Sequence, residues 1–386
     1  MSLRAKIEHE IRERGPIPFS WYMELCLYDP QLGYYSRNDE KFGRAGDFFT
    51  SSDVHAVFAR LLARQFEEIW RALGAPQQLE LLELGTGRGL FARDVLDWSA
   101  KKFPLFFQAL HYTMTERSAA LRNGLETRME AHLHSGKVTI TDFDNKGTSL
   151  RALAADTPII VFTNEFFDAL PVEILSQAGS LRINARDGRF VEEWVPASAV
   201  ELEFLDRYGV HPEADERTEV SVEAHRHASS LGQMIGRGFF IAIDYGYTRE
   251  EQCAGRHLDT VMTYRQHTAS PNPYDAPGEQ DITAHVNFTA LGAALEQQGM
   301  HTQPLLTQSQ FLIGIGEENQ FADAFEECRL PQERAKVALQ LKQLVTPAGM
   351  GETFHVLVAS KGVPGSATEQ LRGLSFGKSR IFSEPI

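Results

Sequence analysis

Short apolar runs that alternate with amphipathic stretches fill the middle of the chain, and this alternation constrains the fold more than any other feature. Five of the runs have the length and composition of β-strands, at residues 79–84, 111–115, 138–141, 158–163 and 239–244. Helical stretches with one apolar face separate the first three of them. Strands and helices in this order form βαβ units, so the sequence predicts an α/β fold with a doubly wound parallel sheet.

Two later segments extend the predicted sheet to seven strands. Residues 301–307 and 354–360 have strand patterns and follow a helical stretch at 288–298. The alternation is interrupted between about residues 172 and 237, where Asp187-Gly188 joins two apolar runs as a hairpin turn does. We interpret this stretch as an inserted β-hairpin and helical subdomain.

The predicted domain organisation has three parts. Residues 1–75 form a helical N-terminal segment, and this segment contains a loop rich in Gly, Tyr, Phe and Asp at about residues 29–53. Residues 76–362 form the α/β core with its insertion. Residues 363–386 form a polar C-terminal tail.

Charge and cysteine content narrow the class of function. The chain has 38 basic and 52 acidic residues and a net charge of −14. Nucleic-acid binding normally requires a positive surface, so a basic protein segment or a cationic small molecule is a better electrostatic partner. The three cysteines lie far apart and form no CxxC pair, which predicts neither a disulfide framework nor a zinc site. No metal is expected.

The hydropathy of the chain bears on its location. No apolar run approaches the roughly 18 residues that a membrane span requires. The first residues lack the apolar region of a signal peptide and hold too many acids for a transit peptide. We therefore predict a soluble, cytoplasmic protein without a membrane span.

The clearest local motif is ELGTGRG at residues 83–89, which lies directly between a predicted strand and a predicted helix. Glycines let the backbone N–H groups of such a turn approach a ligand closely. The GxGxG spacing differs from the GxGxxG of dinucleotide sites, and the acid Glu83 precedes the first glycine by two residues. An amine or sulfonium ligand suits this acid better than a pyrophosphate. The alternative is a tight turn without a ligand.

Acidic side chains follow the next two predicted strands. Glu116 ends the second strand, where a carboxylate could accept two hydrogen bonds from a ribose diol. Asp142 and Phe143 end the third strand, and they place an acid beside an aromatic ring that could flank an adenine. A helix-capping acid and a plain surface turn are the alternatives at these two positions.

The fourth predicted strand runs into the segment NEFFDALP at residues 164–171. Open α/β sheets bind ligands at the carboxyl ends of their strands, so Asn164 and Glu165 could face a cofactor, with Asp168 nearby on the following turn. Asp244-Tyr245-Gly246 ends the fifth strand in a similar way. These residues could instead only cap the elements that follow them.

This set of motifs resembles the MidA family of S-adenosylmethionine-dependent methyltransferases, which includes the mitochondrial complex I assembly factor that methylates an arginine. The resemblance runs from about residue 7 to 362 and is carried most specifically by GDFFTS at 46–51 and NEFFDALPV at 164–172. Two positions depart from the family pattern. Thr86 stands where the family usually has proline, and Ser52-Asp53 stands in place of Pro-Glu.

The resemblance implies a class I methyltransferase fold, which is Rossmann-like, and S-adenosyl-L-methionine as the cofactor. It implies that the cofactor is bound by residues from both the N-terminal segment and the core. The cofactor-binding residues predicted by the resemblance are Gly46, Thr50, Gly85, Thr86, Gly87, Glu116, Asp142, Phe143 and Asn164. Glu83 of the ELGTGRG motif is predicted to bind the cofactor as well. The loop of the N-terminal segment is expected to close over the site.

The resemblance also implies an arginine of a protein as the methyl acceptor. A guanidinium stays protonated in water and is a poor nucleophile, and a pair of carboxylates can bind its fork and localise a lone pair on one nitrogen. We expect Glu165 and Asp47 to do this, with Asp168 as the third candidate. The implied partner is an arginine-bearing subunit, with one of respiratory complex I as a candidate. The hairpin could be either a homodimer surface or a substrate clamp.

Three other readings stay open at this point. A non-catalytic assembly factor could bind the cofactor only as a structural ligand, and cofactor turnover separates this alternative from an enzyme. A nicotinamide oxidoreductase is disfavoured by the glycine spacing. A methyltransferase for small molecules or nucleic acids would share the fold, because the fold alone does not set the acceptor.

Overall fold

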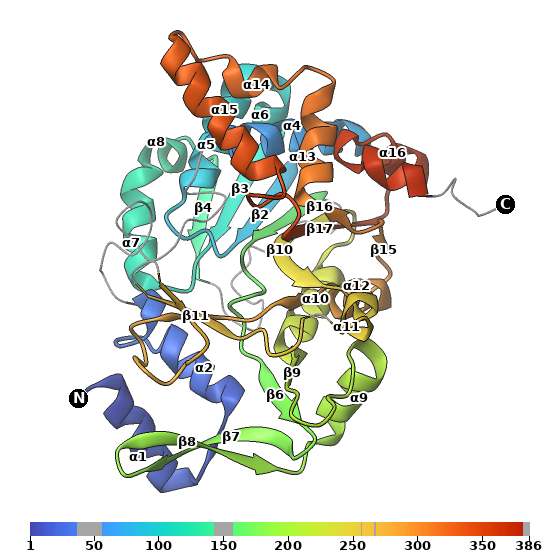
Figure 1. The fold of residues 1–386 in the computed structure, drawn as a ribbon. Helices are drawn as coiled ribbons and strands as arrows, with labels where there is room; N and C mark the ends of the chain where they lie inside the picture. Colours follow the sequence, from blue (N-terminus) through green and yellow to red (C-terminus); the bar gives the residue numbers. More distant parts are fainter. Residues whose placement is uncertain (37–55, 143–156, 256, 266–267, 381–386) are drawn as a thin grey trace, which may run out of the picture.

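The computed structural model describes residues 1–36, 56–142, 157–255, 257–265 and 268–380. A large sheet with helices on both faces forms one part of the molecule, and the N-terminal helices with the inserted hairpin form a second part beneath its edge (Figure 1). Within the described residues, no helix is long and apolar enough to cross a membrane.

The large sheet contains the seven predicted strands in the order β15-β17-β10-β5-β2-β3-β4. The pairs from β10 to β4 are parallel, and β17 runs antiparallel to β10. This arrangement confirms the predicted doubly wound α/β fold. The strands are β2 (Leu79–Leu84), β3 (Leu110–Thr115), β4 (Val138–Thr141), β5 (Ile159–Asn164), β10 (Gly238–Tyr247), β15 (His301–Thr302), β16 (Leu306–Thr307), β17 (Phe354–Lys361) and, beside β10, β14 (Val286–Asn287).

One predicted strand is divided in the structure. The segment 301–307 forms the two short strands β15 and β16, and both pair with β17. Pro304 lies between them. Proline has no N–H to donate to a ladder, so it interrupts the pairing at that point.

The central strands are apolar on both faces because helices cover both. On one face, Phe239 and Ile241 of β10 pack in a core with α4, α5 and α13, and on the other face Phe240 packs with α10 and α12. Continuous apolar runs of this kind are typical of parallel sheets. The helices of the two faces and of the sheet rim are α4 (Ala56–Ala72), α5 (Leu90–Lys102), α6 (Pro104–Ala109), α7 (Ala119–Arg128), α8 (Glu130–His134), α10 (Val222–Met234), α12 (Phe288–Gln297) and α13 (Gln308–Glu317).

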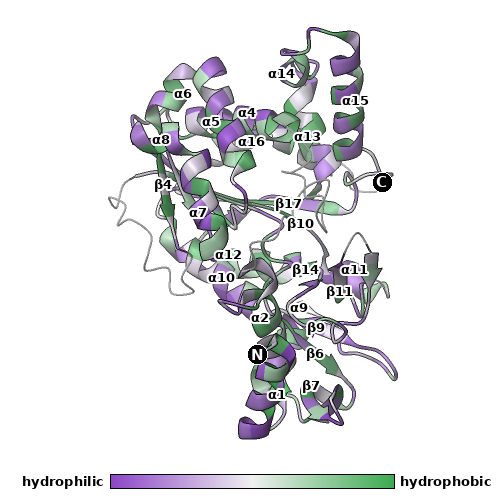
Figure 2. Cartoon of the chain, turned by 90° about the vertical axis from the view of Figure 1, so that its left-hand side faces the viewer, coloured by the Kyte–Doolittle hydropathy of each residue, from purple (hydrophilic) through white to green (hydrophobic). Residues whose placement is uncertain are grey.

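The segment between β16 and β17 is helical, although its sequence predicted no element there. It forms α13, α14 (Ala322–Phe325) and α15 (Pro331–Val345). Gly314 allows α13 to lie close to the C-terminal segment, because a Cβ at this position would lie 2.4 Å from the carbonyl oxygen of Arg372. Glycine lowers helix propensity, which explains why the pattern did not predict α13. α15 lies at the periphery (Figure 1) and is largely hydrophilic (Figure 2).

The segment after β17 folds back onto the core. It forms α16 (Gly365–Glu369) and the 3₁₀ segment η2 (Arg372–Arg380). Leu371 and Leu374 are buried in the same core as α4 and α13. The chain beyond β17 therefore contributes to the main core as far as these leucines.

The N-terminal helices and the insertion form one unit. The predicted hairpin is present as β7 (Gly179–Arg186) and β8 (Arg189–Val195), and β1 (Ile17–Pro18) from the N-terminal segment pairs with β7. Their shared core includes Ile7, Tyr22 and Ile183. The remaining elements of this unit and its surroundings are α1 (Leu3–Arg14), α2 (Phe19–Tyr28), η1 (Tyr34–Ser36), β6 (Glu173–Ser176), α9 (Ala199–Tyr208), β9 (Thr218–Val220), α11 (Arg249–Cys253), β11 (Met262–Arg265), β12 (Thr268–Ser270) and β13 (Asp281–Thr283).

Candidate active site

The glycine turn joins β2 to α5 at the carboxyl edge of the sheet. Gly85 has φ +67° and Gly87 has φ +56°, a backbone conformation that favours glycine. A Cβ on Gly85 would lie 3.0 Å from the Phe166 ring, whereas a Cβ on Gly87 would have no described residue within 4 Å. The N–H of Thr86 donates to the carbonyl of Thr115 at 3.1 Å, which holds the turn against β3. Among the described residues, the turn is thus packed at Gly85 and uncovered at Gly87.

Glu116 lies beside this turn, as the sequence predicted. One carboxylate oxygen accepts the N–H of Gly87 at 2.9 Å, and the other accepts the N–H of Ser118 at 2.8 Å. Burial raises the pKa of Glu116, and these two backbone donors act in the opposite direction. Both oxygens are therefore held in place, and Glu116 links the ends of β2 and β3.

Glu83 is buried at the end of β2, below the turn. Its carboxyl group accepts a hydrogen bond from the Tyr112 hydroxyl at 2.8 Å. Burial raises the pKa of Glu83 to about 8, and the neighbouring Glu116 carboxylate adds to the increase. Burial therefore disfavours the charged form of Glu83, and a cation bound nearby would favour its ionised form.

Asp142 lies at the end of β4 and is exposed. It forms an ion pair with Arg122 at 2.8 Å, and the same guanidinium donates to the backbone carbonyl of Arg117 at 2.8 Å. This arginine therefore joins the ends of β3 and β4. The predicted site residues Gly46, Asp47, Thr50 and Phe143 lie outside the described residues.

The segment after β5 lies against the glycine turn. Glu165 has φ +51°, which is unusual for a residue other than glycine. The amide nitrogen of Asn164 donates to the Glu165 carboxylate at 3.1 Å, and the amide oxygen of Asn164 has no hydrogen-bond partner among the described residues. The ring of Phe166 then contacts Gly85. Phe166 was not among the predicted site residues, although it lies within the NEFFDALP motif.

Asp168 is a buried acid with one unused oxygen. Its side chain accepts the Tyr245 hydroxyl at 2.6 Å through Oδ2, whereas Oδ1 has no hydrogen-bond partner in the part of the chain that the structure describes. The residue is 4% exposed. Burial raises the pKa of Asp168 to about 6. A buried carboxylate with a free oxygen is costly unless a ligand supplies a donor.

Asp244, at the end of β10, holds the segment after β5 in its conformation. Its carboxylate accepts backbone N–H groups from Phe166 at 3.2 Å, from Phe167 at 3.0 Å and from Tyr245 at 3.0 Å. Burial and then the carboxylates of Asp168 and Glu165 raise the pKa of Asp244. The sequence placed Asp244 at a strand end but did not predict this role.

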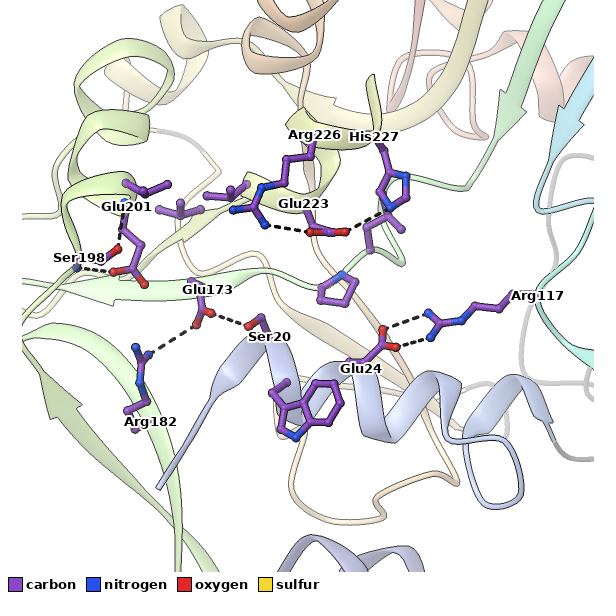
Figure 3. Close-up of a pocket in the computed structure, with 16 residues that line it drawn as sticks. Ser20, Glu24, Arg117, Glu173, Arg182, Ser198, Glu201, Glu223, Arg226 and His227 are labelled. Atoms are coloured by element: carbon purple, nitrogen blue, oxygen red, sulfur yellow. Dashed lines mark hydrogen bonds and ion pairs between the residues drawn. The ribbon is translucent and has the colours of Figure 1, made fainter. Parts of the chain in front are cut away.

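A cleft of about 520 Å³ adjoins this end of the edge, between α2, β6, α9 and α10 (Figure 3). Arg117, which directly follows Glu116, lines it and forms a two-bond ion pair with Glu24. His227 lines it from α10, and its ring centroid lies 6.3 Å from that of Phe166. The sequence did not reveal the cleft because its lining residues come from segments far apart in the chain.

Comparisons with known proteins agree with this geometry. A family model of S-adenosyl-L-methionine-dependent methyltransferases matches residues 61–306. The mitochondrial protein arginine methyltransferase NDUFAF7 homolog of Drosophila melanogaster is 30% identical, over 94% of this chain and 85% of its own length. The mitochondrial protein arginine methyltransferase NDUFAF7 of Homo sapiens is 26% identical, over 90% of this chain and 80% of its own.

A solved structure is similar over nearly the whole chain. It is a protein from Burkholderia thailandensis bound to S-adenosyl-homocysteine, with 30% sequence identity and a TM-score of 0.80. The likeness covers 97% of this chain and 94% of that protein.

One prediction is corrected by these relatives. The sequence predicted a cytoplasmic protein, but the relatives are mitochondrial by name, which contradicts that location. The prediction rested on the lack of a recognisable targeting segment. That lack does not determine the location of the protein.

Proposed function

Because this chain belongs to the family of S-adenosyl-L-methionine-dependent methyltransferases, we propose that it transfers the methyl group to an arginine of a protein. The enzyme class and the cofactor follow from the family, and both predictions are confirmed. The choice of arginine is supported by the names of the relatives. The observation that carries it in this chain is the buried Oδ1 of Asp168, which has no partner among the described residues.

The residues of the glycine turn fit the cofactor. No residue of the described ranges would lie within 4 Å of a Cβ on Gly87, and the N–H of this residue is held by Glu116. We assign Gly85, Thr86 and Gly87 to the methionine part of the cofactor, and Glu116 to its ribose. When bound, the cofactor supplies a methyl group on a positively charged sulfur, which is the electrophile of the reaction.

Three further residues are assigned to the cofactor by their positions. The unpartnered amide oxygen of Asn164 can accept a hydrogen bond from the amino group of the methionine part. Glu83 lies below the same turn and favours a positive charge there. Asp142 directly follows β4, and we assign it to the adenine. Gly46, Thr50 and Phe143 stay predictions, since they lie outside the described residues.

On the acceptor side, the chain must orient a guanidinium and take up a proton. Glu165 and Asp168 follow β5, and Asp244 fixes the turn that carries them. Carboxylates at this position can bind the guanidinium fork and align one nitrogen with the methyl group. The pKa of about 6 lets Asp168 accept the proton that the methylated nitrogen releases. Asp47, the predicted partner of Glu165, lies outside the described residues and stays a prediction.

The most specific part of the proposal is which protein carries the acceptor arginine. The net charge of −14 suits a basic protein segment. A subunit of respiratory complex I is the acceptor that the MidA resemblance implies, and it stays a prediction. The same holds for a homodimer formed through the β7–β8 hairpin.

The test is a product analysis. The purified protein is incubated with S-adenosylmethionine that carries a labelled methyl group and with a mitochondrial protein extract, and the acceptor proteins are hydrolysed to amino acids. We expect the label in methylarginine. Label in methyl-lysine, or none in protein while the cofactor is still converted, would contradict the proposal. The Gly85→Val variant serves as the inactive control.

A further inference from the structure

We propose that Asp281, with Asp168, forms a binding site for the acceptor guanidinium that is walled by four tyrosine rings. This site rests on the proposed function and adds Asp281 and the tyrosines, which were not among the predicted site residues. The rings, here called the tyrosine wall, are Tyr28, Tyr35, Tyr245 and Tyr264.

Asp281 is brought to Asp168 by β13. The N–H of Ala284, just after this strand, donates to the backbone carbonyl of Asp168 at 3.0 Å. Within the β11–β13 pair, Tyr264 lies directly opposite Asp281. The Tyr35 hydroxyl donates to the Asp281 carboxylate at 2.9 Å. A short strand therefore places a second acid and two tyrosines next to the segment that follows β5.

Each acid accepts a hydrogen bond from a hydroxyl group of the tyrosine wall, Asp281 from Tyr35 and Asp168 from Tyr245. Burial raises the pKa of Tyr28, of Tyr35 and of Tyr264, and the carboxylates of Asp168 and Asp281 each raise all three further. Tyr245 donates directly to Asp168. The rings of Tyr28 and Tyr35 lie 5.5 Å apart, and the Tyr28 hydroxyl donates to the carbonyl of Ala169 at 3.0 Å. The two acids thus share Tyr28, Tyr35 and Tyr264 as aromatic neighbours.

The chemistry of this enclosure favours a guanidinium. Asp168 and Asp281 are 4% and 6% exposed, and the Oδ1 atom of Asp168 has no partner among the described residues. The buried Asp168 carboxylate, with Oδ1 unpartnered among the described residues, favours a cation, and nearby aromatic rings can add to that attraction. A planar guanidinium has five N–H donors, which can serve two carboxylates, whereas a lysine ammonium has three donors around one point.

The chain already shows this kind of contact on the Tyr28 ring. The guanidinium carbon of Arg117 lies 4.3 Å from the centre of that ring, and the guanidinium is paired with Glu24. Arg117, Tyr28 and Glu24 therefore already combine a guanidinium, an aromatic ring and a carboxylate next to the tyrosine wall.

The experiment measures binding of a small probe to the full chain loaded with S-adenosyl-homocysteine. The probes are the N-acetyl methylamides of arginine, of citrulline, which has the same shape without the charge, and of lysine. A fragment of this size should bind with a Kd on the order of 1 mM. We expect the arginine probe to bind at least about tenfold more tightly than the other two, because only it combines charge with a planar donor fork.

Variants assign the binding to the site. In Asp281→Asn we expect the affinity for the arginine probe to fall at least about fivefold, with S-adenosyl-homocysteine binding changed less than about twofold. Asp275→Asn is the matched control, since Asp275 is exposed in the loop before β13 and bonds only to Asn272 among the contacts the structure gives it. If Asp281→Asn does not fold, Asp168→Asn takes its place, and the same loss is expected.

The outcomes separate this inference from the proposed function. Equal binding of arginine and citrulline probes, unchanged arginine binding in Asp281→Asn and in Asp168→Asn, or no detectable arginine binding would each overturn the site. If methylarginine is nevertheless formed by the wild type, the proposed function stands without it. If the arginine probe binds through Asp281 but the product is methyl-lysine, the site stands and the proposed function fails.

Discussion

The cofactor side and the acceptor side of the same sheet edge satisfy their buried acids differently. On the cofactor side, both oxygens of Glu116 accept backbone N–H groups. On the acceptor side, Asp168 has one oxygen bonded to Tyr245 and a second without a partner among the described residues. Both acids are buried. The first side is therefore arranged before any ligand arrives, while the second is completed by a ligand.

This difference indicates a division of labour along the edge. A preformed turn binds the cofactor without rearrangement, which lowers the entropy lost on binding. A buried acid with a free oxygen lowers the stability of the empty protein but strengthens the binding of a cation. Asp244 connects the two sides, because its carboxylate fixes the backbone at Phe166, whose ring lies against Gly85.

The largest effect is expected at the preformed side. Gly85→Val places a branched side chain at φ +67° and against Phe166. We expect S-adenosylmethionine affinity, measured by isothermal titration, to fall at least about 100-fold, which corresponds to roughly 3 kcal/mol.

The control for this variant separates backbone strain from loss of the site. Gly188→Val has the same kind of positive φ, +71°, in the hairpin turn, where a Cβ would meet no described residue within 4 Å. Gly188→Val should lower the free energy of unfolding but leave cofactor affinity within about threefold of the wild type. Equal losses in the two variants would show that the glycine turn has no special part in binding.

The next effect concerns the pH dependence of stability on the acceptor side. Asp168 has a pKa of about 6 in the fold against 3.8 for an ordinary aspartate. A raised pKa contributes stability that is complete below the lower value and is lost as the pH rises through the higher one. We therefore expect the free energy of unfolding of Asp168→Asn, relative to wild type, to rise by about 2 kcal/mol between pH 4 and pH 8.

Urea unfolding at a series of pH values measures this change. The arginine probe, when present, should reduce it, since a bound cation lowers the pKa of the acid. If the difference in free energy of unfolding between Asp168→Asn and the wild type does not vary with pH, the pKa of Asp168 is not raised in the fold.

A smaller effect on cofactor affinity is expected when Glu116 is altered, the acid whose two oxygens both accept backbone N–H groups. Glu116→Gln keeps the shape but removes one acceptor and the charge, and so weakens the hold on the Gly87 N–H. Cofactor affinity should fall about tenfold, or roughly 1.5 kcal/mol. Binding of the arginine probe should be unchanged. Loss of both affinities in titration would show that the two sides are not independent.

The smallest effect is expected in the cleft. Arg226 pairs with Glu223 at 3.5 Å, and its side chain is 67% exposed. Exposed pairs contribute little, so Arg226→Ala should change the free energy of unfolding by less than about 0.5 kcal/mol and leave both affinities unchanged. If the cleft holds the chain that flanks the acceptor, KM for a protein substrate rises a few-fold. A change in the affinity of the arginine probe would instead place the cleft within the guanidinium site.

Much of the core follows from local pattern. The strands β2, β5 and β10 were predicted at or near their observed bounds because continuous apolar runs are required wherever both faces of a sheet are covered. The glycine turn was predicted because its residues are contiguous and their spacing is specific. The placement of Glu116 beside the turn followed in the same way, since parallel strands end at one edge.

Contacts between distant segments could not be predicted in this way. The pairing of β1 with β7 joins the N-terminal segment to the insertion, and no local pattern encodes which strand meets which. The helix α13 was missed because its glycines, which allow close packing, lower its helix propensity.

The sequence by itself determined the α/β class, the strand ends that carry polar groups and the family to which the chain belongs. Only the tertiary structure decided that Glu116 is held by two backbone donors, that Asp168 Oδ1 has no partner among the described residues, and that β13 runs beside the segment after β5. The reason is physical. Strand and turn formation depend on neighbouring residues, whereas the burial and pKa of a carboxyl group depend on every segment that folding brings around it.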